Sequence, residues 1–143
     1  MIIIKKQYEI EEPIKLVDEN ENILYEFKMQ LTDEDVDQLE NALFGEDIIK
    51  LAKKIKEMEN KTLTEEEEAK IIEMGKELNS TAEDLIEKLC FKDHKDEFIR
   101  LGGVSKYNET KALIGDYLTN FFMKRQVSRI NTINSDLAKI SQN

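Results

Sequence analysis

The stretch YEIEEPIKLVDENENILYEFKMQL, residues 8–31, decides the start of the fold through its pattern of apolar residues. Apolar side chains fall on even positions up to residue 16 and on odd positions from residue 23 onward. This alternation predicts two strands, each with one face on a core and one face in water. Between them, DENEN at 18–22 supplies Asp and Asn, which suit a tight turn. The stretch predicts a β-hairpin whose first strand is an edge strand or is bulged at Pro13.

A lone hairpin is marginally stable in water, so this one needs other elements to pack against. From Thr32 onward the apolar period is helical. We expect one helix that is capped by Thr32, runs through Leu43 and stops at Gly45, and another from about residue 46 to 59. Thr64 and Ser80 are each followed three residues later by Glu, which is the capping-box pattern at the start of a helix. A short helix after Asp93 should end at the glycine pair 102–103, and Asn108 should begin the last helix.

We therefore expect a mainly α protein with an N-terminal β-hairpin, an α+β fold with a small helical body. The 143 residues fit one domain, with a hairpin region (1–31), a helical body (32–125) and a C-terminal helical or frayed tail (126–143). The residues expected in its core are Tyr25, Phe27, Leu85, Leu89, Leu113 and Phe121.

The charge of this chain is strongly acidic and unevenly distributed. The net charge is −10, and residues 1–68 alone hold 20 acidic and 9 basic residues. Such a surface repels nucleic acid phosphates and favours solubility, so we expect no nucleic acid partner. No apolar run is long enough to cross a bilayer, so we expect no membrane contact and a cytoplasmic location.

The only cysteine and the only histidine lie four residues apart in KLCFKDHKDEFIRLGG, residues 88–103. Cys90 completes an apolar helical stripe, where a free cysteine acts as a small hydrophobe, whereas His94 follows in a polar segment after a helix break. A zinc site needs about four ligands, and a cysteine nucleophile needs a base beside it. We interpret Cys90 and His94 as structural residues.

No other pattern indicates catalytic or cofactor chemistry. DENEN resembles the first half of a calcium loop, but Ile23 stands at the sixth position in place of Gly and Met29 at the twelfth in place of Glu. The acidic runs DEDVD and EEEE lie at helix starts, where the helix dipole stabilises carboxylates. We expect no catalytic, cofactor-binding or metal-binding residues, and a protein that is not an enzyme.

Residues 126–143 keep a helical apolar period in a segment of weak helix formers. One interpretation is a partner-binding strip that becomes ordered on a client or on a second copy of the chain, where Lys124, Arg125 and Arg129 would meet that copy's acidic front half. The other interpretation is a helix that folds back onto its own body. The residues of the predicted strip are Val127, Ile130, Leu137 and Ile140.

The order of the elements resembles that of a known family. The hairpin IKLVDENENILYEFKMQL leads into the acid-capped helices TDEDVDQLENALFGEDIIKL, and AEDLIEKLCF and NETKALIGDYLTNFFMKRQ follow. Over roughly residues 8–125 this is similar to the small tail assembly chaperones of phages, prophages and phage-tail-like bacteriocins. The resemblance implies a non-enzymatic protein of the host cell cytoplasm that keeps a tape-measure or tail-tube protein soluble until the tail polymerises. It implies a protein client, and homo-oligomers are a further possibility.

Two other functions fit the same residues. An acidic decoy that mimics DNA would use the carboxylates of residues 1–68, and its binding should weaken steeply with salt. A structural tail component would remain in the finished particle, whereas a chaperone would be absent from it.

Overall fold

The computed structural model describes residues 1–141. The predicted fold class is confirmed, because an antiparallel hairpin is followed by long helices. The elements are β1 (Ile10–Val17), β2 (Ile23–Leu31), α1 (Asp33–Phe44), α2 (Glu46–Met58), α3 (Glu65–Ile86), a π-helical turn (Glu87–Phe91), a 3-10 turn (Lys92–His94) and α4 (Lys95–Ser141).

The hairpin has the predicted alternation of faces. Ile14 pairs with Phe27 and Leu16 with Tyr25, so apolar residues of both strands share one face. The register shift lies between Leu16 and Val17, and Pro13 pairs regularly, as an edge strand allows.

The DENEN turn is held by one side chain. The carboxylate of Asp18 accepts hydrogen bonds from the backbone amides of Asn20 and Asn22, each at 2.9 Å. These bonds, above all the one from Asn22, hold the pKa of Asp18 below its usual value. Glu21 adopts a φ of 65°, the left-handed backbone that closes the turn. The Asp18 carboxylate therefore serves the turn itself.

Two of the predicted helix caps are confirmed, and two are wrong. Thr32 forms a capping box with Asp35, and the amide of Glu67 donates to the Thr64 hydroxyl at 3.2 Å. Ser80 does not start a helix, because α3 runs through it; the neighbouring Thr81 hydroxyl donates to the carbonyl of Glu77 at 2.9 Å, a bond made inside a helix.

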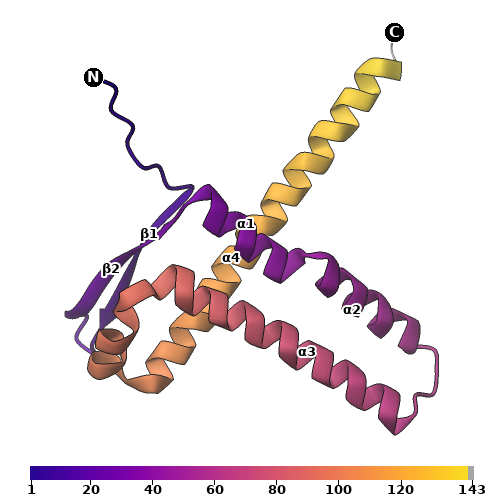
Figure 1. The fold of residues 1–143 in the computed structure, drawn as a ribbon, viewed down its shortest axis with the longest axis horizontal. Coiled ribbons are helices and arrows are strands. Elements are labelled where there is room, and N and C mark those ends of the chain that lie inside the picture. Colours follow the sequence, from indigo (N-terminus) through magenta and orange to yellow (C-terminus); the bar gives the residue numbers. More distant parts are fainter. Residues whose placement is uncertain (142–143) are drawn as a thin grey trace.

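Asn108 also lies inside a helix, because the helical residues that follow the break at Gly103 begin before Asn108. Gly103 has φ 86° and ψ 164°, which interrupts the helical backbone at the predicted glycine pair. The break changes the direction of the chain between the start of α4 and its long remainder (Figure 1).

The core forms where the apolar face of the hairpin meets the π-helical turn and α4. Phe91 is fully buried, with its ring centroid 5.6 Å from that of Phe27 and 4.8 Å from that of Tyr107. Leu89 and Phe27 are buried as predicted, and Tyr25, Leu85 and Phe121 pack partly buried against them.

Leu113 was wrongly placed in this core, because its side chain is 61% exposed. The next residue, Ile114, is buried instead, together with Tyr107, Leu118 and Phe122. These residues recur at intervals of four and seven and so define the face of α4 that meets the core. The prediction failed by one residue, which is about 100° around a helix.

Two helical parts of the chain extend away from this body (Figure 1). One is an arm made of α2 and the first part of α3, in which α2 contributes no buried residue. The other is the C-terminal part of α4. None of the helices in residues 1–141 is both long and apolar enough to cross a membrane.

Candidate functional site

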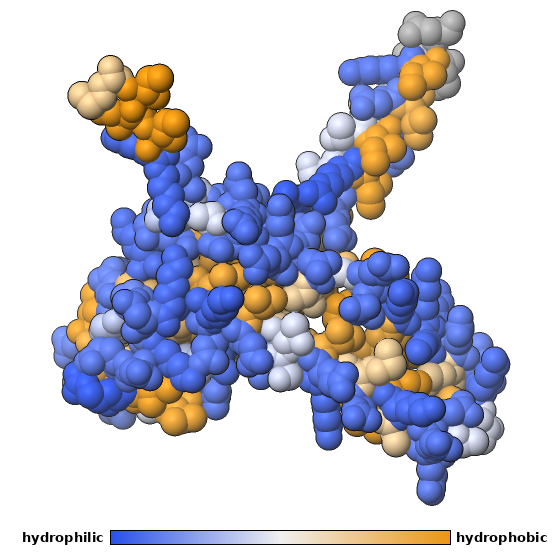
Figure 2. Space-filling view, viewed as in Figure 1, coloured by the Kyte–Doolittle hydropathy of each residue, from blue (hydrophilic) through white to orange (hydrophobic). Residues whose placement is uncertain are grey.

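The C-terminal part of α4 carries a row of exposed apolar side chains. Figure 2 shows them along the helix that projects from the body. They are 52–70% exposed: Met123, Val127, Ile130, Ile133, Leu137 and Ile140. We call these six residues the α4 stripe.

The α4 stripe forms one continuous strip of surface. At 100° per residue its members fall within an arc of about 140°. Its centre is rotated by about 110° from the face of α4 that covers the core. Phe122, the last of the core-facing residues named above, is fully buried, whereas the neighbouring Met123 points about 100° away and is 52% exposed. The stripe is therefore a separate surface of the helix.

The predicted strip residues Val127, Ile130, Leu137 and Ile140 all lie in the stripe. They do not fold back onto the body, and residues 126–141 continue α4 as a helix. Residues 142 and 143 of the predicted tail lie outside the described residues. Sequence reasoning missed Met123 and Ile133, although Ile133 repeats the same helical period and Met123 precedes Val127 by one turn.

Ion pairs tie the base of the projecting helix to the body. Arg125 Nη1 lies 3.2 Å from Glu9 Oε1 and 3.8 Å from Glu40 Oε2, and Arg129 Nη1 lies 3.4 Å from Glu40 Oε1. Burial raises the pKa of Glu9, and the Arg125 charge opposes that rise. Arg125 and Arg129 thus meet acidic residues of their own chain. Contact of these residues with a second copy stays a prediction.

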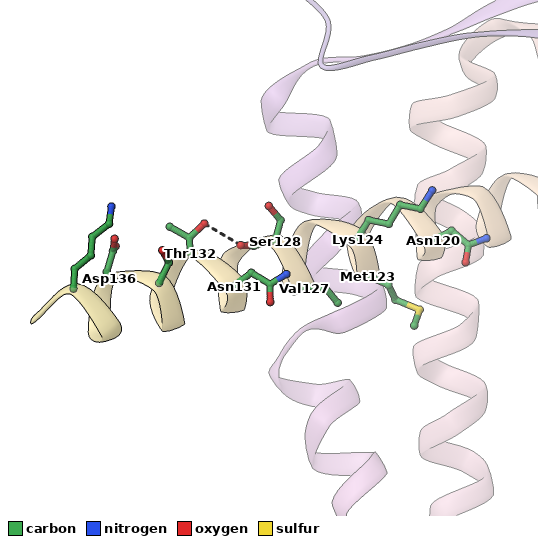
Figure 3. Close-up of a pocket in the computed structure, with 10 residues that line it drawn as sticks. Asn120, Met123, Lys124, Val127, Ser128, Asn131, Thr132 and Asp136 are labelled. Atoms are coloured by element: carbon green, nitrogen blue, oxygen red, sulfur yellow. Dashed lines mark hydrogen bonds between the residues drawn. The ribbon is translucent and has the colours of Figure 1, made fainter. Parts of the chain in front are cut away.

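A shallow groove runs along one side of the stripe (Figure 3). Met123 and Val127 form its apolar edge, and the rest is mostly polar. The hydroxyl of Thr132 donates to the carbonyl of Ser128 at 3.0 Å, within the helix backbone. The groove is open along a single helix and mostly polar, so it does not enclose a small molecule, and the apolar stripe beside it is the surface that suits an elongated partner.

A second exposed apolar segment lies at the other end of the chain. Residues 1–4, which are Met-Ile-Ile-Ile, are at least 73% exposed and project from the hairpin (Figure 2). They have no regular structure, so they present no defined face. The α4 stripe is therefore the better candidate for a specific surface.

Cys90 and His94 occupy different environments. The Cys90 thiol is buried, and this burial raises its pKa to about 12. His94 stacks on Phe27 with ring centroids 4.5 Å apart, and its Nδ1 lies 2.5 Å from the Tyr25 hydroxyl. Lys92, with φ 52°, turns the backbone between them. The raised pKa keeps the Cys90 thiol protonated, whereas a nucleophile needs the thiolate. The His94 ring packs against the hairpin.

His94 therefore differs from the sequence expectation in one respect. It lies in a short polar segment, but its ring fills space beside Tyr25 and Phe27. Its Nε2 lies 3.7 Å from the Asp93 carboxylate. A neutral ring with its proton on Nε2 would accept from the Tyr25 hydroxyl at Nδ1.

Acidic, cysteine and histidine side chains in residues 1–141 nowhere gather in threes that could hold a metal ion. Comparison with protein-family models, curated proteins and solved structures found no match to this chain.

Proposed function

We propose that this protein is a non-enzymatic assembly chaperone that binds a helical protein client through the α4 stripe. The observation that carries the proposal is the stripe itself, six apolar residues at helical spacing on a helix that extends from the body. An amphipathic helix of a client can lay its apolar face against such a strip, and the polar flanks can fix its orientation.

The acidic body supports the same role. A protein that holds an apolar client in solution must expose apolar surface and still resist aggregation. The net charge of −10 provides repulsion between complexes. The ion pairs of Arg125 and Arg129 hold the start of the α4 stripe at the surface of the body.

The client we propose is a tape-measure or tail-tube protein of a phage, prophage or phage-tail-like bacteriocin, kept soluble in the host cytoplasm before the tail polymerises. The order of hairpin, acid-capped helices and long final helix supports this choice. The choice of client rests on the family resemblance, whereas the binding surface rests on the exposed apolar side chains of α4.

Co-expression with such a client tests the proposal. We expect wild-type protein to increase the soluble fraction of the client, and Ile133→Asp to abolish this effect because it places a charge in the stripe. Thr132→Asp is the matched control, since it adds the same charge to the opposite side of the helix and should preserve activity.

A second variant separates binding from folding. Deleting residues 127–143 removes every residue of the α4 stripe except Met123. It leaves the core, which includes Phe122. The truncated protein should stay folded and lose client binding. If both it and Ile133→Asp still solubilise the client, the stripe is not the client site.

Two further outcomes would point to the other functions. Recovery of the protein in purified tail particles by mass spectrometry would indicate a structural component. Binding that disappears steeply with added salt and is unaffected by Ile133→Asp would indicate an acidic decoy.

A further inference from the structure

We propose that, in the absence of a client, the α4 stripe is covered by the same stripe of a second copy, with the two helices antiparallel. This inference rests on the proposed function, because it names what covers the client-binding stripe when no client is bound. The spacing of the apolar residues and the charges of α4 support this pairing.

The spacing within the stripe suits a coiled coil. Ile130, Ile133, Leu137 and Ile140 follow one another at intervals of three, four and three, which is the alternation of a and d positions in a heptad. Met123 lies one heptad before Ile130 and extends the seam toward the body. The seam from 123 to 140 is about 27 Å long at 1.5 Å per residue.

The charges beside the seam select the antiparallel direction. In this heptad Arg129 and Asp136 are successive g positions, on the same flank of the stripe. The e positions on the other flank are uncharged: Asn120, Val127 and Asn134. In an antiparallel pair g residues face g residues, so Arg129 of each copy can meet Asp136 of the other. In a parallel pair Arg129 would face only Asn134 of the other copy.

One register satisfies the seam and the charges together. Ile130 of one copy opposes Ile133 of the other, and Met123 opposes Ile140. Arg129 and Asp136 then lie opposite each other twice, related by the two-fold axis. Gln126 opposite Leu137 is the one polar side chain in the seam, a type of position that can specify register.

Contacts within each copy leave these groups available. The side chain of Arg129 is 52% exposed, and a guanidinium with five donors can keep its contact with Glu40 while it binds another carboxylate. Among residues 1–141, no cationic group lies within ion-pair distance of Asp136.

The whole-chain charge favours the same arrangement. Each copy carries −10, and most of the acidic excess lies in residues 1–68, away from the projecting end of α4. Antiparallel helices place the two acidic bodies at opposite ends of the pair, whereas parallel helices would bring them together against their repulsion. Self-association then covers the stripe, and a client helix must displace the second copy.

Sedimentation equilibrium of the full chain without any client tests the pairing independently of the proposed function. We expect a concentration-dependent dimer, and Asp136→Arg should raise its dissociation constant about tenfold because two ion pairs become two repulsions. The double variant Arg129→Asp with Asp136→Arg should restore the wild-type constant. Lys139→Asp, a reversal on the opposite side of the helix, should change it little.

A monomer at all concentrations would overturn the proposal. So would a dimer that Asp136→Arg leaves unchanged, or one that the double variant fails to restore while circular dichroism shows intact helices. A dimer that follows these expectations in a protein without client activity would leave the pairing standing and refute the proposed function alone.

Discussion

The two halves of the long part of α4 are continuous in backbone and opposite in environment. Residues 104–122 bury Tyr107, Ile114, Leu118 and Phe122 in the core, whereas residues 123–140 expose the α4 stripe. Helix geometry is the same in both halves, so the difference lies in what the rest of the chain covers. The first half is part of the fold, and the second half is a surface that the fold presents.

Substitutions of the two adjacent residues at the junction test this difference between the halves most directly. Phe122→Ala should lower the free energy of unfolding by about 3–5 kcal/mol, because it opens a cavity beside Phe44 and Phe121. Met123→Ala should change it by less than about 0.5 kcal/mol. Urea unfolding of both variants, at a concentration where the protein is monomeric, measures the difference. Comparable losses would mean that the second half belongs to the core.

The break at Gly103 sets the direction of both halves. Its φ of 86° with ψ of 164° is a backbone region that residues with a side chain essentially do not occupy. Gly103→Ala should therefore cost about 1–3 kcal/mol of stability. Gly75→Ala is the matched control, because it lies inside α3 with only Leu51 near its added methyl, and it should be neutral or slightly stabilising. A neutral Gly103→Ala would show that the break does not need this backbone.

The hairpin and the helix boundaries at Thr32, Gly45 and Thr64 could be predicted because local rules determine them. The alternation of residues 8–31 leaves one possible buried face, and Thr32, Gly45 and Thr64 act within one turn of their own positions. Ser80 failed because a capping pattern also occurs inside helices, where continued packing of α3 outweighs it. Leu113 failed because residues 113 and 114 are both apolar, and only the packing of α4 against the rest of the chain decides which one is buried.

The helical spacing of the stripe could be predicted from the sequence, but its exposure to solvent could not. Val127, Ile130, Leu137 and Ile140 show their helical spacing in the sequence, yet the same spacing describes residues packed on a body. Their exposure depends on where the core ends, which is a tertiary property. The pairing of Arg125 with Glu9 joins residues 116 positions apart, and no local pattern indicates it.

Cys90 tests whether water reaches the core of the folded protein, and we expect a moderate effect on the free energy of unfolding. Burial, aided by the negative charge of Asp35, raises the pKa of its thiol from 9.0 to about 12. The unfolded chain loses the thiol proton near pH 9 while the folded protein retains it. The stability from this group is therefore fully present below pH 9 and is lost as pH rises toward 12.

At pH 10 this loss should reach about 1 kcal/mol relative to pH 8. Cys90→Ala removes the dependence, at an initial cost on the order of 1 kcal/mol for the lost volume. The difference in unfolding free energy between wild type and this variant should shrink between pH 8 and pH 10. A constant difference would mean that water reaches the thiol in the folded protein.

The smallest expected effect compares one polar contact in the body with one on the projecting helix. Tyr25→Phe removes the hydroxyl that lies 2.5 Å from Nδ1 of His94 in a partly buried setting, and should cost about 0.5–1.5 kcal/mol. Arg129→Gln removes an exposed ion pair to Glu40, which keeps Arg125 as a neighbour, and should cost less than about 0.5 kcal/mol. Urea unfolding of the monomer measures both. If Arg129→Gln is the more costly of the two, the second half of α4 is held to the body as part of the fold, and the distinction between the halves fails.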